Sequence, residues 1–147
     1  MGPGGTRAPG RSGVMLILNG RIADARTSLA AYEADQARYA ARAAEAITRP
    51  NPDGWTALDA AWDAIRAEAV AVYLRTALGN ADADGGTDEA WVGQLPVLAT
   101  WANAQLRTFP TGGFGSSDSA RMNARAGAEA AAEVARAVEF ALVGGRL

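Results

Sequence analysis

Six apolar residues between positions 55 and 72 are separated alternately by three and four residues. They are Trp55, Leu58, Trp62, Ile65, Ala69 and Val72, named here the 55–72 stripe. Such spacing returns to the same side of an α-helix at each turn, so it predicts an amphipathic helix. Asp53 is a typical N-cap and Gly79 a typical stop, which bounds this helix. We expect the stripe, with its two tryptophans, to lie in the core.

A second helical segment is predicted from Ile22 to Thr48. Its apolar residues at three- and four-residue spacing are Leu29, Tyr32, Tyr39, Ala43 and Ile47. The sequence Arg49-Pro50-Asn51-Pro52 ends this helix, because a residue that precedes proline is driven out of the α-helical region. We expect the helix to pack through this set of residues.

Two more helices are predicted in the second half of the chain. One follows the cap residue Thr87, contains or restarts at Pro96, and stops near Phe109. Its apolar residues are Trp91, Leu95, Leu98 and either Trp101 or Ala102. The other begins at Asp118 and ends at Gly144-Gly145, with a stripe of Met122, Ala126, Ala130, Val134, Val138 and Leu142. A stripe rich in alanine buries little area, which favours a bundle that gains stability from a partner copy.

The fold class that follows is all-α. We expect a four-helix bundle-like domain over residues 14–147, behind a flexible Gly/Pro/Arg arm over residues 1–13. The domain opens with five apolar residues, Val14, Met15, Leu16, Ile17 and Leu18. These form either a short strand that needs a partner from another copy or an apolar plug on the first helix. With Phe114 of the glycine-rich loop 111–117, they are the candidate interface residues.

The composition excludes many kinds of catalytic site. The chain has no histidine, no cysteine and no lysine, since all 14 basic residues are arginine. This composition therefore excludes zinc fingers, thiolate nucleophiles, histidine general bases, lysine Schiff bases and P-loops. Any catalysis would depend on Asp, Glu, Arg, Tyr, Ser, Thr or a borrowed metal. We therefore favour a protein that is not an enzyme and carries no cofactor.

The charge pattern argues against nucleic acid as a partner. The formal net charge is −2, and arginines are interspersed with acidic residues along the predicted helices instead of forming one basic face. The longest strongly apolar run has five residues, which is too short for a membrane helix or a secretory signal. A soluble, cytoplasmic protein is the expectation.

The segment 80–89 resembles an EF-hand calcium loop in part. Asn80, Asp82, Asp84 and Asp88 fall at ligand positions, with Gly85 at the turn. Trp91 stands where the motif has a bidentate glutamate, so only weak Ca²⁺ binding would be possible. The other interpretation is a solvated acidic loop that caps the next helix.

Aromatic and charged side chains supply the remaining candidate sites. Seven aromatic residues could line one cavity for a flat apolar ligand, or could be the large core residues of an alanine-rich bundle. They are Trp55, Trp62, Tyr73, Trp91, Trp101, Tyr32 and Tyr39. Arg26, Arg66 and Arg75 are candidates for positions near the core, although we favour surface ion pairs for them. Asp59 or Asp63 could neutralise a buried arginine.

Two functions remain. The favoured hypothesis is a non-catalytic interaction or scaffold protein, which assembles with itself or serves as a small subunit of a virion or an enzyme complex. Its partner is then a protein or another copy of the chain. The alternative is a helical bundle that binds a small aromatic or hydrophobic ligand among the Trp and Tyr side chains, with Asp/Arg-assisted chemistry.

Overall fold

Four helices make up the computed structural model, which describes residues 15–108 and 118–143. They are α1 (Ile22–Thr48), α2 (Gly54–Ala83), α3 (Asp88–Thr108) and α4 (Asp118–Val143). No strand occurs in the described part of the chain, so the predicted all-α class is confirmed. The expected arm over 1–13, Val14 and Phe114 lie outside the described residues, as do Phe109 and the Gly144-Gly145 stop.

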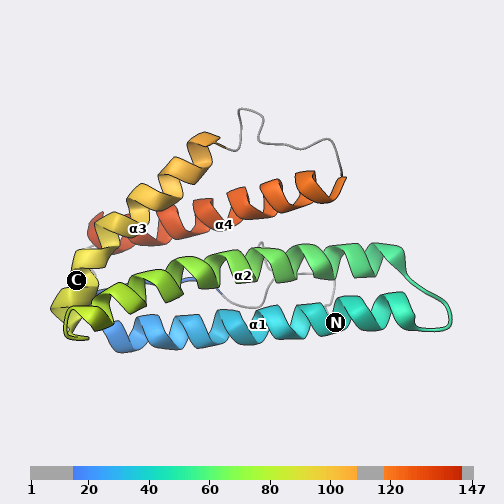
Figure 1. Ribbon diagram of the computed structural model, residues 1–147, viewed down its shortest axis with the longest axis horizontal. Coiled ribbons are helices and arrows are strands. Elements are labelled where there is room, and N and C mark those ends of the chain that lie inside the picture. Colours follow the sequence, from blue (N-terminus) through green and yellow to red (C-terminus); the bar gives the residue numbers. More distant parts are fainter. Residues whose placement is uncertain (1–14, 109–117, 144–147) are drawn as a thin grey trace.

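Helices α1 and α2 form a long antiparallel hairpin (Figure 1). Helix α1 has the predicted bounds, because Pro50 and Pro52 prevent it from continuing. Asp53 caps α2 as predicted: its side chain accepts a hydrogen bond from the Thr56 backbone N–H, 3.1 Å away. The short connection brings the two helices into contact along their length.

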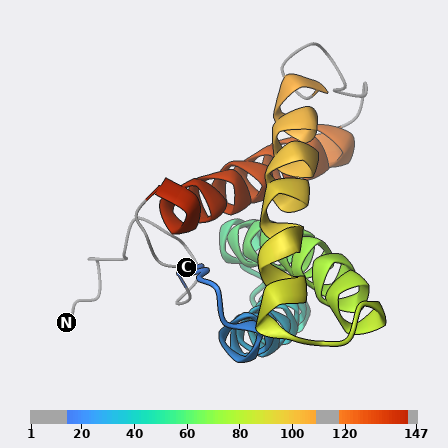
Figure 2. The same cartoon turned by 90° about the vertical axis from the view of Figure 1, so that its left-hand side faces the viewer.

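Helices α3 and α4 pack against the hairpin from one side. Helix α3 is continuous through Pro96, and the Thr87 hydroxyl caps it by accepting from the Ala90 N–H. Side-chain contacts pair Trp62 with Glu129 and Arg66 with Glu133, so α4 runs beside α2 in the same direction. Figure 2 shows α3 and α4 crossing each other, and Figure 1 places this crossing toward the end of the hairpin where α3 begins.

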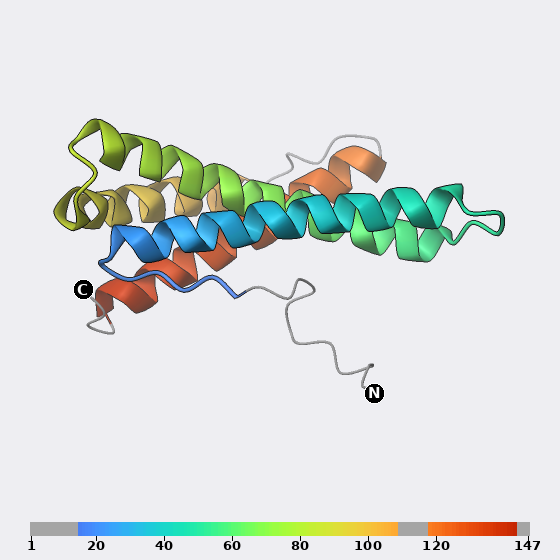
Figure 3. The same cartoon turned by 90° about the horizontal axis from the view of Figure 1, so that it is seen from below.

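The main core lies toward that same end of the hairpin and takes buried residues from all four helices. Its largest fully buried side chains are Trp91, Tyr32, Leu18, Leu74, Leu95, Leu98, Val70, Val134 and Val138. Leu16 and Leu18 also enter the main core, from an extended segment that Figure 3 shows running along α1. The plug interpretation of this segment is therefore confirmed, and the strand interpretation is not.

The opposite end of the hairpin has much less core. Tyr39, Ala60 and Ala64 form a separate small cluster there, with Ala43 packed against it. Only α1 and α2 contribute to this cluster. Two helices alone enclose little volume, so large side chains at this end remain in contact with solvent.

The prediction that the 55–72 stripe is the buried face of α2 is wrong. The core side of α2 is instead its alanine-rich side, with Val70, Leu74 and Leu78. Because α2 is apolar on more than one side, spacing alone does not identify which side the other helices cover. Small alanines permit close helix approach, and the neighbouring helices pack against them.

The predicted end of α2 at Gly79 is also wrong. The helix continues through Gly79 to Ala83, and Asp84 is its C-cap. The reversal takes place at Gly85 and Gly86, whose φ angles of 106° and 69° belong to the left-handed region that glycine tolerates. In the described ranges, no helix is both long and apolar enough to span a bilayer.

Candidate functional site

The 55–72 stripe is an apolar row on α2 that supplies no buried residue to the main core, although Ala69 packs against that core. None of its six residues is buried. Trp55 is 81% exposed, Leu58 48% and Val72 46%, while Trp62, Ile65 and Ala69 are half-buried. A continuous apolar row about 25 Å long therefore remains accessible on one helix.

The neighbours of α2 explain why this row stays open. Helix α1 contacts α2 through Ala60 and Ala64, and Ala60 and Ala67 lie on the side of the helix opposite the stripe. Helix α4 approaches at the flank, where Arg66 projects. The stripe occupies the remaining sector of α2.

Trp62 marks the edge of the stripe that faces α4. Its Nε1–H donates to Glu129 Oε1 at 2.8 Å, and the Arg125 guanidinium lies 5.7 Å from the centre of its ring. Both partners come from α4, so the indole is held at the boundary between the two helices. Trp55 and Leu58 continue the row beyond this contact toward the end of the hairpin.

A buried polar cluster, named here the Arg66 cluster, joins α1, α2 and α4. Arg66 Nη1 donates to Glu133 Oε1 at 2.8 Å, and the other oxygen of Glu133 accepts from the Tyr32 hydroxyl. The surface ion pair favoured for Arg66 is wrong, because this residue is buried. Its carboxylate partner is Glu133 of α4, not Asp59 or Asp63. No local spacing pairs residues 66 and 133, so sequence reasoning had no signal from which to find this contact.

The Arg66 cluster positions α4 against the α1–α2 hairpin. Burial, followed by the hydrogen bond to Glu133, raises the pKa of the Tyr32 phenol, which therefore stays protonated and donates. A guanidinium, a carboxylate and a phenol held together in this way fix the register of α4 against the hairpin. Each of these groups is engaged with another side chain of the cluster.

The other two candidate arginines form surface pairs, as favoured from the sequence. Arg26 Nη2 lies 2.6 Å from Asp82 Oδ1, and Arg75 Nη2 lies 3.0 Å from Glu33 Oε2. All four side chains are about half exposed. Such pairs contribute little to stability, because solvent screens them.

The four candidate calcium ligands are not arranged as an EF-hand loop. Asn80 and Asp82 belong to the last turn of α2, Asp84 is its C-cap, and Asp88 begins α3. Asp82 pairs with Arg26, which holds the pKa of its carboxyl below the usual value, and Asp88 accepts from the Ile22 N–H. In residues 15–108 and 118–143, no group of three or more acidic side chains is placed to hold a metal ion. The continuation of α2 past Gly79 separates the expected ligands.

The seven aromatic residues are distributed over the molecule. Tyr32, Tyr39 and Trp91 are buried, and Trp91 Nε1 donates to the Asn19 carbonyl at 2.8 Å. Tyr73 and Trp101 pack against the outside of the main core, while Trp55 is exposed. The fold therefore does not bring the set around one cavity.

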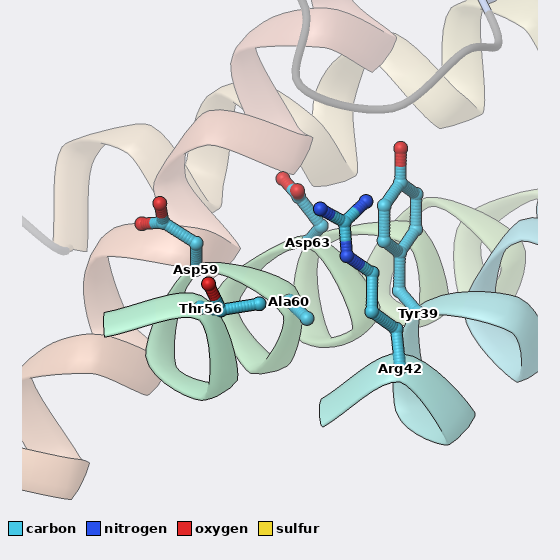
Figure 4. A pocket seen from close by; sticks show the side chains of 6 residues that line it. All are labelled: Tyr39, Arg42, Thr56, Asp59, Ala60 and Asp63. Carbon is cyan, nitrogen blue, oxygen red and sulfur yellow. The ribbon is translucent and has the colours of Figure 1, made fainter. Parts of the chain in front are cut away.

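A small cavity does lie between the outer parts of α1 and α2 (Figure 4). It measures about 60 Å³ and is lined by Tyr39, Arg42, Thr56, Asp59, Ala60 and Asp63. Arg42 extends from α1 toward Asp63, as Figure 4 shows. Pockets for organic ligands usually measure about 300–1,000 Å³ and have mainly apolar walls. This one is polar and has room for a few water molecules.

The remaining candidate interface residues divide into two sets. Leu16 and Leu18 are buried in the main core, while Met15 and Ile17 point outward and are exposed. This alternation follows from the extended backbone, in which successive side chains point to opposite sides. Half of the described apolar run therefore serves the fold and half faces solvent.

Comparison of the chain with protein-family models, curated proteins and solved structures gives no match. We therefore infer function from the side chains and geometry of the molecule itself.

Proposed function

We propose that this protein is a non-catalytic helical interaction protein and that the 55–72 stripe is its docking face. The observation that carries the proposal is the exposure of Trp55, at 81%, at the start of an apolar row in which no residue is fully buried. The expected partner is a helix of another polypeptide chain.

Physical chemistry supports this role for the stripe. Apolar residues at positions i, i+3, i+7 and i+10 are the pattern with which one helix packs along another. Tryptophan is enriched among the residues that dominate binding energy, because its large rigid surface loses little conformational entropy. The row contains no charged residue that a partner would have to desolvate.

The rest of the molecule holds α2 in a fixed position, as such a contact requires. The Arg66 cluster and the main core hold α2 between α1 and α4. A docking face on a fixed helix loses little freedom on binding, which favours affinity. The absence of histidine, cysteine and lysine from the sequence leaves few means of catalysis.

Photo-crosslinking in cells that express the protein tests this proposal. Benzoylphenylalanine replaces Trp55, and in a matched control it replaces Ala37, an exposed residue on α1. We expect irradiation to yield discrete covalent protein adducts from position 55 and none from position 37. If position 55 gives no adduct of any size, or if both positions give the same adducts, the proposal is overturned.

A further inference from the structure

We infer that the occupant of the 55–72 stripe is the same stripe of a second copy of this chain, packed antiparallel. This inference rests on the proposed function, because it names the partner of that docking face. It predicts a symmetric dimer in which the two α2 helices lie along each other and the rest of each chain faces outward.

The spacing of the stripe is the same in both directions along the helix. Intervals of three, four, three, four and three residues read identically from Trp55 to Val72 and from Val72 to Trp55. A two-fold axis that crosses the helix near its middle therefore places each apolar residue opposite another. The opposed pairs are Trp55 with Val72, Leu58 with Ala69, and Trp62 with Ile65.

The sizes of the side chains select the antiparallel arrangement. Each residue of the first half, Trp55, Leu58 and Trp62, is larger than the residue that it faces in the second half, Val72, Ala69 and Ile65 respectively. Antiparallel pairing places a larger side chain opposite a smaller one at every level, which fills space evenly. Parallel pairing would place tryptophan against tryptophan and alanine against alanine, with crowding at one end and gaps at the other.

The surroundings of the stripe leave room for a second copy. Trp55 and Val72, at the two ends of the row, are both exposed and are the residues that face each other in the antiparallel pair. Arg125 and Glu129, which contact Trp62, both belong to α4. A second α2 would approach from the opposite side of the row.

The size of this contact sets the expected affinity. A standard stable interface buries about 800 Å² on each partner. One helix face about 25 Å long is smaller, so we expect a dimer that dissociates in the micromolar range. The measurements must therefore cover protein concentrations from about 1 μM to about 1 mM.

Sedimentation equilibrium of the full chain is the first test. We expect the mass to rise from 15.1 kDa toward twice that value with concentration. Val72→Asp should raise the dissociation constant of the dimer at least ~10-fold, because it buries an unpaired charge in the contact. Met15→Asp is the matched control: Met15 is as exposed as Trp55 but lies outside the stripe, so this variant should dimerise like the unmodified chain.

Disulfide trapping tests the orientation, and the cysteine-free chain makes it unambiguous. Trp55→Cys and Val72→Cys chains are oxidised separately and as a mixture. Antiparallel pairing predicts a disulfide-linked dimer in the mixture only, because two sulfurs both introduced at position 55 would lie about 25 Å apart. A dimer from Trp55→Cys alone means parallel pairing and overturns the inference.

Three other results would also overturn it. One is a chain that stays monomeric throughout the concentration range. Another is dimerisation that Val72→Asp leaves intact. The third is loss of helical circular dichroism in Val72→Asp, which means that another part of the same chain covers the stripe.

The cross-linking at position 55 separates this inference from the proposed function. An adduct with a different protein supports the function and excludes the second copy, whereas no adduct overturns both.

Discussion

Trp91 and Trp55 stand at opposite ends of the α1–α2 hairpin and meet different surroundings. Trp91 is fully buried, with its Nε1–H bonded to the Asn19 carbonyl, where all four helices and the extended segment converge. Trp55 lies where only α1 and α2 are present, and most of its surface faces solvent. The number of helices that meet at a position, and not the residue type, decides which tryptophan becomes core.

The largest expected effect is the contrast between these two residues. Trp91→Ala should lower the free energy of unfolding by about 3–5 kcal/mol, because it leaves a cavity in the main core. Trp55→Ala should change it by no more than about 0.5 kcal/mol in dilute protein, because the side chain has few contacts to lose. Urea unfolding followed by circular dichroism measures both. Equal losses in the two variants would show that the ends of the hairpin do not differ in this way.

The next effect concerns the attachment of α4 to the hairpin. Glu133→Ala removes the hydrogen-bonded carboxylate of the buried Arg66 and leaves only Glu129, half-exposed and 4.0 Å away, so it should cost about 3 kcal/mol of unfolding free energy. Glu33→Ala removes a partner of comparable geometry from the exposed Arg75 and should cost less than about 1 kcal/mol. The same urea experiment compares them. A larger loss for Glu33→Ala would contradict the assignment of α4 docking to the Arg66 cluster.

The smallest expected effect is a pH dependence of stability that arises at the end of the hairpin where only α1 and α2 are present. Hydrogen bonds from the Thr56 hydroxyl and backbone N–H, with the nearby Arg49, hold the pKa of Asp53 below its usual value. The cap therefore stabilises α2 above a pH of about 4, near the ordinary pKa of aspartate, and this contribution is lost as the pH falls through the lower folded-state value.

Asp53→Asn separates capping from titration, because asparagine also caps helices but does not ionise. We expect the thermal midpoint of the unmodified chain to fall slightly more than that of Asp53→Asn between pH 6 and pH 3. Circular dichroism on heating measures the difference, which should be smaller than the effect of Glu133→Ala. Identical pH profiles would exclude Asp53 as the source.

Local rules predicted several parts of the fold from the sequence. The proline pair after α1, the Asp53 cap and the Thr87 cap act within a few residues, and all three hold in the structure. The stripe of α3 was also predicted, and Trp91, Leu95, Leu98 and Ala102 are its buried residues. That helix has one clearly apolar side, so its spacing had a single interpretation.

The candidate site has features that local rules did not predict. The residues of the 55–72 stripe were identified as one apolar row, but their burial was predicted wrongly because α2 has a second apolar side made largely of alanine. The link from Arg66 to Glu133 joins residues on different helices, so no short-range pattern encodes it. Gly79 resembled a stop, yet α2 continues through it to Ala83.

The four helices could be recognised in the amino-acid order alone, because caps, prolines and apolar periodicity operate over distances of a few residues. The same order fixes which side chains are available for chemistry. The packing of the helices was needed to establish which side of α2 is core and which is open. That choice depends on how the four helices pack together. The alanine-rich side of α2 permits the closest approach of its neighbours, so this side is buried and the stripe remains open to solvent.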